Sequence, residues 1–401
     1  MMIKTPKSLR LHIGIFGKTN VGKSSFLNAI TKQDISIVSE VAGTTTDVVE
    51  KSIELFPIGP VTFLDTAGIG DSTELGELRL EKTLQVIPRC DVAVLIIDSN
   101  GLTDYEITLI DKFKEFNIPY QIVINKYDIE QIPADKYNIL LDYTNIIIET
   151  SSVNDKNIVD KFVESIIKIL PDEFINPPSI LGDKINKEDL IILVTPIDKE
   201  APKGRLILPE VQTIRDILDN DCMALVIQEN NLEKALKLLK VKPKLVVTDS
   251  QAFKAVDKIV PEDIDITSFS ILFARLKGDL QTFLRGCKAI DSLNENDRVL
   301  ILESCTHHTI EDDIAREKIP KLLKKKLGFN LNFEYKSGHD FPSISGYKLI
   351  IHCGACMTNR KEVLSRILIA NKKNIPITNY GMVISYCLGI LDRAVKIFNC
   401  E

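Results

Sequence analysis

The segment that most constrains this chain is the run at 17–24, which reads Gly-Lys-Thr-Asn-Val-Gly-Lys-Ser. It fits the pattern G-x-x-x-x-G-K-[ST], with an apolar run at 11–16 before it and a helical pattern at 25–30 after it. In that context the backbone N–H groups of the loop wrap a phosphate at the positive end of the helix. A chance glycine-rich turn would not have both flanking elements. The motif therefore predicts a nucleotide-phosphate loop inside an α/β domain.

The side chains expected around the phosphates follow from charge and metal chemistry. Lys23 would neutralise the β- and γ-phosphates, and the hydroxyl of Ser24 would bind Mg²⁺. Asp65 ends the apolar run at 60–65, where its carboxylate could hold the water shell of Mg²⁺, and the Gly68 amide could then meet the γ-phosphate. The loop residues expected to contact the nucleotide are Asn20, Val21, Gly22, Lys23, Ser24 and Ser25.

Two further segments select the base. Residues 125–128 read Asn-Lys-Tyr-Asp and follow the apolar run at 120–124. The carboxylate of Asp128 can accept hydrogen bonds from the guanine N1–H and the exocyclic amine, a pair of donors that adenine does not offer. Residues 150–152, Thr-Ser-Ser, follow the next strand, where backbone amides would meet the guanine O6. The order and spacing predict GTP rather than ATP. The residues expected at the base are Asn125, Lys126, Asp128, Ser151 and Ser152.

Hydrolysis needs further residues, and we expect Thr45 to act with Lys23. Thr45 lies in a threonine-rich loop at 43–47, where the first switch is expected, and we choose it over its neighbours to close on Mg²⁺ and the γ-phosphate. A solvated threonine loop is the alternative. Ile69 stands where Ras-like enzymes carry the glutamine that orients water. The motif set resembles the TrmE–Era class of bacterial GTPases, which implies that Asn20 binds K⁺ in place of an arginine finger.

Short β-rich runs alternate with helical patterns along the chain, which predicts α/β domains with mostly parallel sheets and flanking helices. The N-terminal runs lie at 11–17, 48–56, 60–65, 92–98, 120–125 and 145–150. A stretch with three prolines and a glycine at 170–189 is interpreted as a linker. Later strands are expected at 190–194, 224–228, 245–248, 298–302, 330–335, 347–352 and 375–379, and helices at 208–219 and 231–239. We divide the chain into domains at 1–172, 187–264 and 265–401.

Cysteine and histidine are concentrated in the last domain. Residues 305–308 read Cys-Thr-His-His after the apolar run at 298–302, and residues 352–356 read His-Cys-Gly-Ala-Cys after an apolar run that ends at 351. Four of the five histidines and most of the eight cysteines lie between residues 287 and 400. In an open α/β sheet both segments would emerge at the carboxyl ends of strands, where such folds place their sites.

Three interpretations of these residues stay open from the residues alone. A Cys₃His zinc site and an Fe–S cluster held by three cysteines both suit the donor types. Buried, inert thiols are the third. The candidate ligands are Cys305, His307, His352, Cys353 and Cys356. The other cysteines are expected to pack as small hydrophobes, and they are Cys90, Cys222, Cys287, Cys387 and Cys400.

A GTP-binding domain joined to this cysteine and histidine pattern resembles one family, the [FeFe]-hydrogenase maturation GTPases called HydF. Residues 201–212 and 248–253 look like the dimerisation domain of that family, and the resemblance covers essentially the whole chain. It implies a GTP-binding domain at 1–172, a dimerisation α/β domain at 187–264 and an α/β Fe–S cluster-binding domain at 265–401.

The resemblance also implies a scaffold function. A [4Fe–4S] cluster would be bound by Cys305, Cys353 and Cys356, with an exchangeable ligand on the remaining iron, for which His307 and His352 are weaker candidates. The scaffold would receive a dinuclear iron precursor from two radical-SAM maturases and deliver it to apo-[FeFe]-hydrogenase. GTP hydrolysis would be a switch that controls partner association, and the expected assembly is a homodimer that could associate further.

Composition disfavours other classes of protein. With 56 acidic and 50 basic residues the formal net charge is −6, which argues against broad contact with nucleic-acid backbones. No apolar run approaches the ~18 residues of a membrane-spanning helix, and the first run is too short for a signal peptide. The uneven cysteine spacing does not suggest a disulfide framework, so we expect a cytoplasmic protein without nucleic-acid or membrane partners. The alternatives are a ribosome- or RNA-associated GTPase with a zinc module, and a regulatory GTPase with inert thiols.

Overall fold

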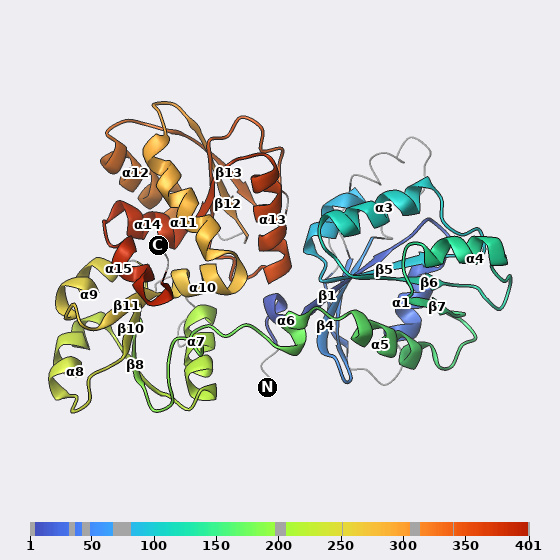
Figure 1. The fold of residues 1–401 in the computed structure, drawn as a ribbon, viewed down its shortest axis with the longest axis horizontal. Coiled ribbons are helices and arrows are strands. Elements are labelled where there is room, and N and C mark those ends of the chain that lie inside the picture. The colour runs from blue at the N-terminus through green and yellow to red at the C-terminus, as the bar shows by residue number, and fades with distance from the viewer. Residues whose placement is uncertain are drawn as a thin grey trace. The chain divides into compact units, whose positions relative to one another are not determined.

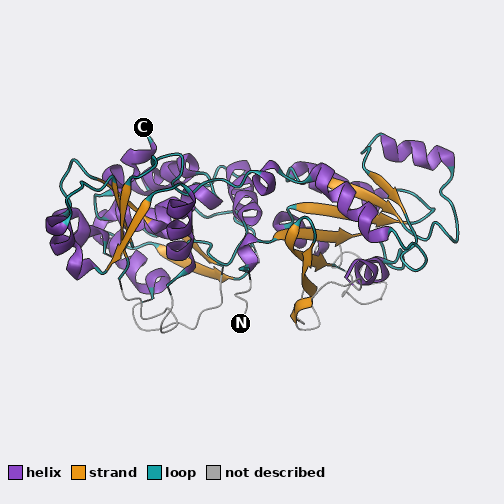
Figure 2. Cartoon of the chain, turned by 90° about the horizontal axis from the view of Figure 1, so that it is seen from below, coloured by secondary structure: helices purple, strands orange, loops and turns teal. Residues whose placement is uncertain are grey.

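The chain forms two compact units, residues Met1–Pro177 and Pro178–Glu401. A computed structural model describes residues 5–31, 37–41, 49–66, 82–196, 206–250, 252–304, 313–339 and 341–399. Figure 1 labels the elements, and Figure 2 shows strands flanked by helices in both units. The prediction of an α/β fold is confirmed. No helix in the described ranges has the length and apolar character needed to cross a bilayer.

The N-terminal unit is built on a seven-stranded sheet in the order β2-β3-β4-β1-β5-β6-β7. Its strands are β1 (Leu11–Phe16), β2 (Ile37–Val41), β3 (Val49–Leu55), β4 (Gly59–Asp65), β5 (Val92–Ile97), β6 (Tyr120–Ile124) and β7 (Ile147–Glu149). The pairings of β3 with β2 and β4 are antiparallel, and the others are parallel. Its main helices are α1 (Lys23–Thr31), α3 (Asp104–Glu115), α4 (Ala134–Leu141) and α5 (Ile158–Ile169). β2 was not expected from the sequence.

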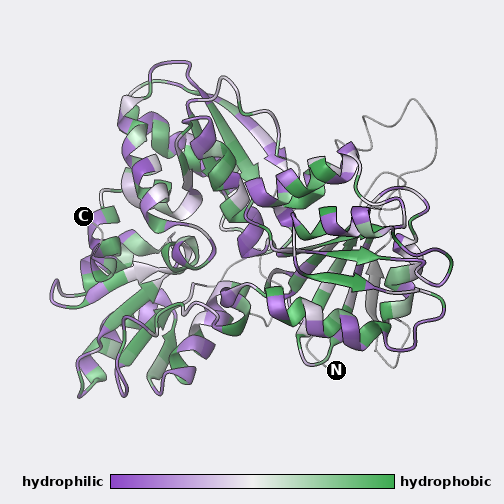
Figure 3. Ribbon diagram, turned by 45° about the vertical axis from the view of Figure 1, so that its right-hand side comes forward, coloured by the Kyte–Doolittle hydropathy of each residue, from purple (hydrophilic) through white to green (hydrophobic). Residues whose placement is uncertain are grey.

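Helices cover both faces of this sheet. α1 and α5 bring Phe26 and Phe162 to a core that lies over one face. α3 and α4 bring Phe113 and Leu140 to a second core over the other face. All six residues of β1 are buried, as expected for a parallel strand covered on both sides. Figure 3 shows the apolar strands inside the unit and polar residues on the outer faces of its helices.

The C-terminal unit contains two four-stranded sheets, ordered β11-β10-β8-β9 and β13-β12-β14-β15, and every pairing in both is parallel. The strands of the first are β8 (Leu190–Val194), β9 (Met223–Ile227), β10 (Leu245–Thr248) and β11 (Asp265–Ser268). Those of the second are β12 (Arg298–Glu303), β13 (Asn332–Ser337), β14 (Leu349–His352) and β15 (Ile377–Asn379). One hydrophobic cluster includes residues of both sheets, among them Leu193 and Ile350.

Most helices of this unit lie in the connections between its parallel strands, and α14 and α15 follow the last strand. They are α7 (Leu208–Asp219), α8 (Leu232–Leu238), α9 (Phe253–Ile259), α10 (Phe269–Lys277), α11 (Leu280–Lys288), α12 (Ile319–Leu327), α13 (Arg360–Lys372), α14 (Tyr380–Cys387) and α15 (Leu391–Val395). The lysines of α12 lie on its exposed side while Leu323 is buried, as expected for a solvated charge run.

Two boundaries differ from the sequence-based expectation. The supposed linker at 170–189 carries α6 (Asp172–Ile175), and from Ile180 onward it packs on the core of the C-terminal unit, where Leu181 is fully buried. The division expected at residue 265 falls at the start of β11, which pairs with β10 in the first sheet. The two sheets are therefore divided after α10 rather than before β11.

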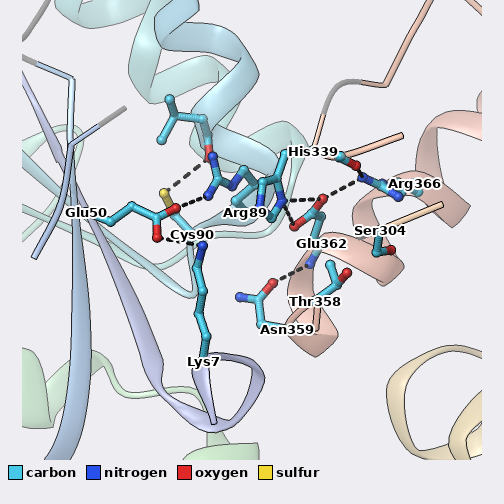
Figure 4. A network of polar contacts seen from close by, with 12 residues as sticks. Lys7, Glu50, Arg89, Cys90, Ser304, His339, Thr358, Asn359, Glu362 and Arg366 are labelled. Carbon is cyan, nitrogen blue, oxygen red and sulfur yellow. Dashed lines mark hydrogen bonds and ion pairs between the residues drawn. The ribbon is translucent and has the colours of Figure 1, made fainter. Parts of the chain in front are cut away.

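A charged cluster ties β3 to two neighbouring segments of the N-terminal unit. The carboxylate of Glu50 lies between Lys7 and Arg89, with an Oε2–Nζ distance of 2.5 Å to Lys7 and an Oε1–Nη2 distance of 2.6 Å to Arg89 (Figure 4). Burial by itself would raise the pKa of Glu50, but the Lys7 ammonium and the Arg89 guanidinium outweigh it and hold this pKa below its usual value.

Replacing Glu50 with glutamine is expected to destabilise the N-terminal unit by about 1–3 kcal/mol at neutral pH, because the buried Arg89 loses its carboxylate partner. A lowered folded-state pKa contributes stability that is complete above the unfolded value of 4.5 and is lost as pH falls through the folded value. Urea unfolding followed by circular dichroism should therefore show a stability difference between wild type and E50Q that shrinks as pH falls below 4.5. E54Q, at an exposed position of the same strand, is the matched control; an equal loss in both variants would contradict the prediction.

Candidate functional site

Two glycines allow the tight loop between β1 and α1. Gly17 has a φ of 137° and Gly22 a φ of 95°. A Cβ atom at Gly17 would lie 2.2 Å from the carbonyl oxygen of Ile96, and one at Gly22 would lie 2.3 Å from Nδ2 of Asn125. Any side chain would strain the backbone and collide with β5 or with the loop after β6. The sequence-predicted phosphate loop is thus present between its predicted strand and helix.

The ammonium of Lys23 spans this loop. Its Nζ donates to the carbonyl oxygens of Gly17 at 2.7 Å and Lys18 at 2.6 Å. Ser24 and Ser25 are exposed in the first turn of α1, and this turn contains no acidic side chain. A cation, free hydroxyls and the positive end of a helix therefore meet at one place, which suits a phosphate with its Mg²⁺.

Asn125 connects the phosphate loop to the loop after β7. Its Nδ2 donates to the carbonyl oxygen of Val21 at 2.9 Å, and its Oδ1 accepts from the backbone N–H of Ser152 at 3.0 Å and from the Ser152 hydroxyl at 2.8 Å. The side chain is buried, so these bonds are shielded from water. Asn125 therefore holds two nucleotide-binding loops in register, a role that its position in the sequence motif alone did not reveal.

The expected base-reading carboxylate is exposed and held in place. Oδ2 of Asp128 accepts from Nδ2 of Asn154 at 2.6 Å. A hydrogen bond from the Ser151 side chain, together with the Asn154 bond, lowers the pKa of Asp128, which keeps it an ionised acceptor. Lys126 reaches back to the phosphate loop, with its Nζ 2.5 Å from the carbonyl oxygen of Asn20. The sequence did not single out Asn154, which holds the Asp128 carboxylate in place.

Asp65 lies at the same edge of the sheet as the phosphate loop. It is the last residue of β4, it is in register with Ile15 of the neighbouring β1, and it is largely buried. The Thr66 hydroxyl donates to the carbonyl oxygen of Ile15 at 2.9 Å and fixes the end of the strand. This position suits a carboxylate that faces Mg²⁺ bound at Ser24. Thr45 and Gly68 lie outside the described residues.

The strands that precede the two cysteine segments lie side by side in the C-terminal unit. β12 and β14 are parallel neighbours, with Leu302 in register with His352. The backbone N–H of Ser304 donates to the sulfur of Cys353 at 3.1 Å. Cys305 directly follows Ser304 in the sequence but lies, with His307 and His308, outside the described residues. Within the described ranges no three His, Cys, Asp or Glu side chains form a metal-binding group.

A buried lysine, Lys277, donates hydrogen bonds to the turn from Cys353 to Cys356 and to the residue two positions after it. Nζ of Lys277 donates to the carbonyl oxygens of Ala355 at 2.6 Å, Thr358 at 2.8 Å and Cys356 at 3.3 Å. Burial lowers the pKa of Lys277 to about 8, and the two cysteines oppose that shift. Burial raises the pKa of Cys353, and hydrogen bonds from Ser304 and the Ala355 backbone oppose this. The backbone N–H groups of Ser304 and Ala355 point at the Cys353 sulfur, and the Lys277 ammonium is nearby. Both features would stabilise a thiolate that binds a metal cluster.

His352 is fixed by two hydrogen bonds. Its Nδ1 is 2.8 Å from the carbonyl oxygen of Cys353, and its Nε2 is 2.7 Å from Nη1 of Arg366. Because a carbonyl only accepts and a guanidinium only donates, the ring is neutral with its proton on Nδ1. Burial and the Arg366 charge lower the pKa of His352 to about 3. To bind iron, this histidine would have to release Arg366.

Arg366 belongs to a wider polar network in which the Glu362 carboxylate accepts from it at 2.6 Å. The Nδ1 atom of His339 lies 3.0 Å from the same carboxylate (Figure 4). Glu362 and Arg366 are almost fully buried, whereas His339 is partly exposed. Polar contacts therefore run from a partly exposed histidine to the carbonyl of Cys353.

The other cysteines have the inert surroundings that the sequence suggested, as far as they are described. Cys90, Cys222 and Cys287 are buried and Cys387 is half-buried. Burial raises the pKa of Cys287 to about 12 and that of Cys387 to about 11. These thiols stay protonated and pack as small apolar groups. Cys400 lies outside the described residues.

Comparison with known protein families decides the identity of the C-terminal unit. Residues 180–278 match the hydrogen maturase F dimerization domain, and residues 281–397 match the hydrogen maturase F tetramerization domain. The chain belongs to the HydF family. Its residues 12–126 match the 50S ribosome-binding GTPase family, so the N-terminal unit of this HydF chain is a P-loop GTPase domain.

Curated relatives that match this HydF chain are GTPases. GTPase Der from Nitratiruptor sp. is 34% identical over 178 residues, which is 41% of this chain and 38% of the relative. The tRNA modification GTPase MnmE from Mesoplasma florum is 35% identical over 185 residues, or 45% of this chain and 39% of the relative. The chain thus spans about two fifths of the length of these relatives.

Among solved structures, a variant of Era from Aquifex aeolicus bound to GDP.AlF4⁻ is 23% identical, with a TM-score of 0.32. The match covers 57% of this chain and 98% of the Era chain.

Proposed function

We propose that this chain hydrolyses GTP with Mg²⁺ and carries a [4Fe–4S] cluster during the maturation of [FeFe]-hydrogenase. The observation that carries the proposal is the contact between the Ser304 N–H and the Cys353 sulfur, which joins the ends of the two strands that precede the candidate cysteines. It occurs in a chain of the HydF family that also has a GTPase domain.

The proposed GTP chemistry assigns a task to each part of the phosphate site. Lys23 neutralises charge on the β- and γ-phosphates, and Ser24 binds Mg²⁺ with Asp65 behind its water shell. Thr45 and the Gly68 amide complete the γ-phosphate contacts when GTP is bound. The bonds from Asn125 to Val21 and Ser152 keep the phosphate and base loops at a fixed spacing, so that little ordering is needed when the nucleotide binds.

The proposed cluster ligands are Cys305, Cys353 and Cys356, with His307 and His352 as weaker candidates for the remaining position. A cluster held by three cysteines has one iron with an exchangeable ligand, and this is where a dinuclear iron precursor could be held. The proposed partners are two radical-SAM maturases that supply the precursor and the apo-hydrogenase that receives it. GTP hydrolysis would control when the chain binds and releases these partners, and the proposed location is the cytoplasm.

Self-association is the remaining part of the proposal. β9 is an edge strand of the first C-terminal sheet, and its Met223 and Val226 are exposed by 49% and 40%. On α7, Val211 and Leu218 are exposed by 48% and 56%. An unpaired edge beside exposed apolar side chains favours pairing with a second copy. We therefore propose a homodimer through the domain expected at 187–264, which could assemble further through the domain expected at 265–401.

Potassium dependence is a specific expectation for hydrolysis. Asn20 is exposed in the phosphate loop, and its backbone has a φ of 65°. If its side chain binds K⁺ beside the γ-phosphate, GTPase rates should be about 10-fold or more higher in K⁺ than in Na⁺, and N20A should lose this difference. Asn117 also has a left-handed backbone, with a φ of 51°, so N117A is a matched control that should keep it. Equal rates in the two salts for the wild type would remove K⁺ from the mechanism.

The cluster proposal is tested by anaerobic reconstitution of the full chain with iron and sulfide. Metal analysis should give close to four irons per chain, as the proposed [4Fe–4S] cluster requires, and the reduced protein should give the EPR signal of such a cluster. Stoichiometric zinc without an Fe–S signal would instead favour the RNA-associated GTPase with a zinc module.

A further inference from the structure

Lys277 is a buried lysine that contacts the turn from Cys353 to Cys356. It is the last residue of α10 and is only 4% exposed. Its three hydrogen bonds end on the carbonyls of Ala355, Cys356 and Thr358, so each of the three ammonium protons has an acceptor in the same short turn. The turn needs such support because Ala355 has a φ of 54°, a left-handed conformation that costs a residue with a Cβ.

The contact between α10 and the turn is reciprocal. Nη1 of Arg360, at the start of α13, donates to the carbonyl oxygens of Leu276 and, at 3.4 Å, of Gly278. Lys277 of α10 therefore donates to carbonyl oxygens of the turn, and Arg360, which follows the turn, donates to carbonyl oxygens at the end of α10. The carbonyls at the end of α10 also form the negative end of that helix, which favours the Arg360 charge.

Among the described residues no ion pair joins Lys277 to a carboxylate, although Glu362 attracts it electrostatically. Its three hydrogen bonds go to carbonyl oxygens, and the Glu362 carboxylate is bonded to Arg366 and His339. A buried cation is costly unless an anion balances it. The two groups that can become anionic on this turn are the thiols of Cys353 and Cys356, both of which interact electrostatically with Lys277.

We propose that Lys277 is a positioning residue for the cluster site. It fixes the Cys353–Cys356 turn through three carbonyls and supplies a fixed positive charge that balances a cluster bound through thiolates. The inference rests on the proposed cluster-binding function and adds to it a residue of α10, a helix within the dimerization-domain match. Removing this charge would make the addition of an electron to the cluster less favourable.

The test compares K277M, K277R and K288M with the wild type as full chains, reconstituted anaerobically. Lys288 is the exposed last residue of the next helix, α11, and serves as the matched control. K277M should hold several-fold less iron, and the fraction that is loaded should have a more negative midpoint potential in an EPR-monitored titration. K277R, which keeps the charge, should recover most of the potential, and K288M should match the wild type in both measurements.

The outcomes distinguish a failure of the proposed cluster-binding function from a failure of the role inferred for Lys277. Wild-type protein that takes up no iron would overturn the proposed function and this inference with it. A wild-type cluster together with normal iron content and potential in K277M would overturn the inference alone. If K277M loses iron but its midpoint potential does not shift, Lys277 is only a structural support for the turn, and the inference is overturned. Unchanged thermal unfolding and GTPase activity serve as the folding control. If K277M does not fold, K277Q, which removes the charge but keeps a hydrogen-bond donor, takes its place in the same measurements.

Discussion

Replacing Asp128 with asparagine is expected to lower the affinity for GTP by about 100-fold or more and to shift the preference to xanthosine triphosphate. The Asp128 carboxylate would accept from the guanine N1–H and amine, and bonds to a charged group contribute about 1.5–3 kcal/mol each. Two such bonds correspond to roughly 10²–10⁴ in affinity. An asparagine amide places a donor against the guanine amine, whereas xanthine has a carbonyl oxygen at that position. Equilibrium titration of each variant with both nucleotides measures the change.

The Asp128 variant should keep its fold, because the side chain is exposed and an asparagine oxygen can still accept from Ser151 and Asn154. D135N, at an exposed position in the first turn of α4, is the matched control and should leave the preference for GTP unchanged. If D128N binds GTP as tightly as the wild type, Asp128 does not read the base, and the GTP assignment would lose its main chemical support.

The GTPase domain could be predicted from the sequence because its motifs are local. The loop requires glycine at 17 and 22 because both residues have a positive φ, a requirement of the local backbone that a sequence motif records. The strands that carry the site are continuous apolar runs, as buried parallel strands require. Helix α7 agrees with its prediction at both ends, since Pro209 lies in its first turn and Asn220 follows its last residue.

Elements and contacts that depend on distant partners could not be predicted in this way. β11 reads Asp-Ile-Thr-Ser, which has little strand character until it pairs with β10. Nothing near Lys277 in the sequence indicates that its ammonium reaches carbonyls 78 to 81 positions away. The bond between Arg366 and His352 likewise joins α13 to β14. Chain folding, rather than local pattern, brings such groups together.

Several assignments remain sequence predictions for a physical reason. Switch and cluster loops present side chains to ligands rather than to the core, so apolar periodicity does not constrain them. Thr45, Gly68, Cys305 and His307 belong to this group and lie outside the described residues. The residues on either side of the Cys305 segment are described. The Ser304 N–H donates to the sulfur of Cys353, and Arg316 bonds both Glu303 and Asp313.

Serine at Cys353 or Cys356 is expected to reduce iron content after reconstitution by more than about ten-fold and to abolish the [4Fe–4S] EPR signal. Loss of a partner in the outer shell of a metal site already costs about 10–100-fold in affinity, and loss of a thiolate ligand should cost more. GTP hydrolysis should persist in both variants, because the phosphate and base loops lie in the N-terminal unit. Iron and sulfide analysis, EPR and a GTPase assay on the same preparations measure these effects.

C387S distinguishes a ligand from an ordinary thiol in this experiment. Cys387 is half-buried in α14, and burial raises its pKa to about 11, so its sulfur stays protonated and is not suited to bind iron. It should load iron as the wild type does. Full iron content in both C353S and C356S would show that these thiols are not the ligands, and if every other activity were also unchanged, the chain would be a regulatory GTPase with inert C-terminal thiols. A selective loss in C353S and C356S would instead tie the cluster to the turn that Lys277 supports.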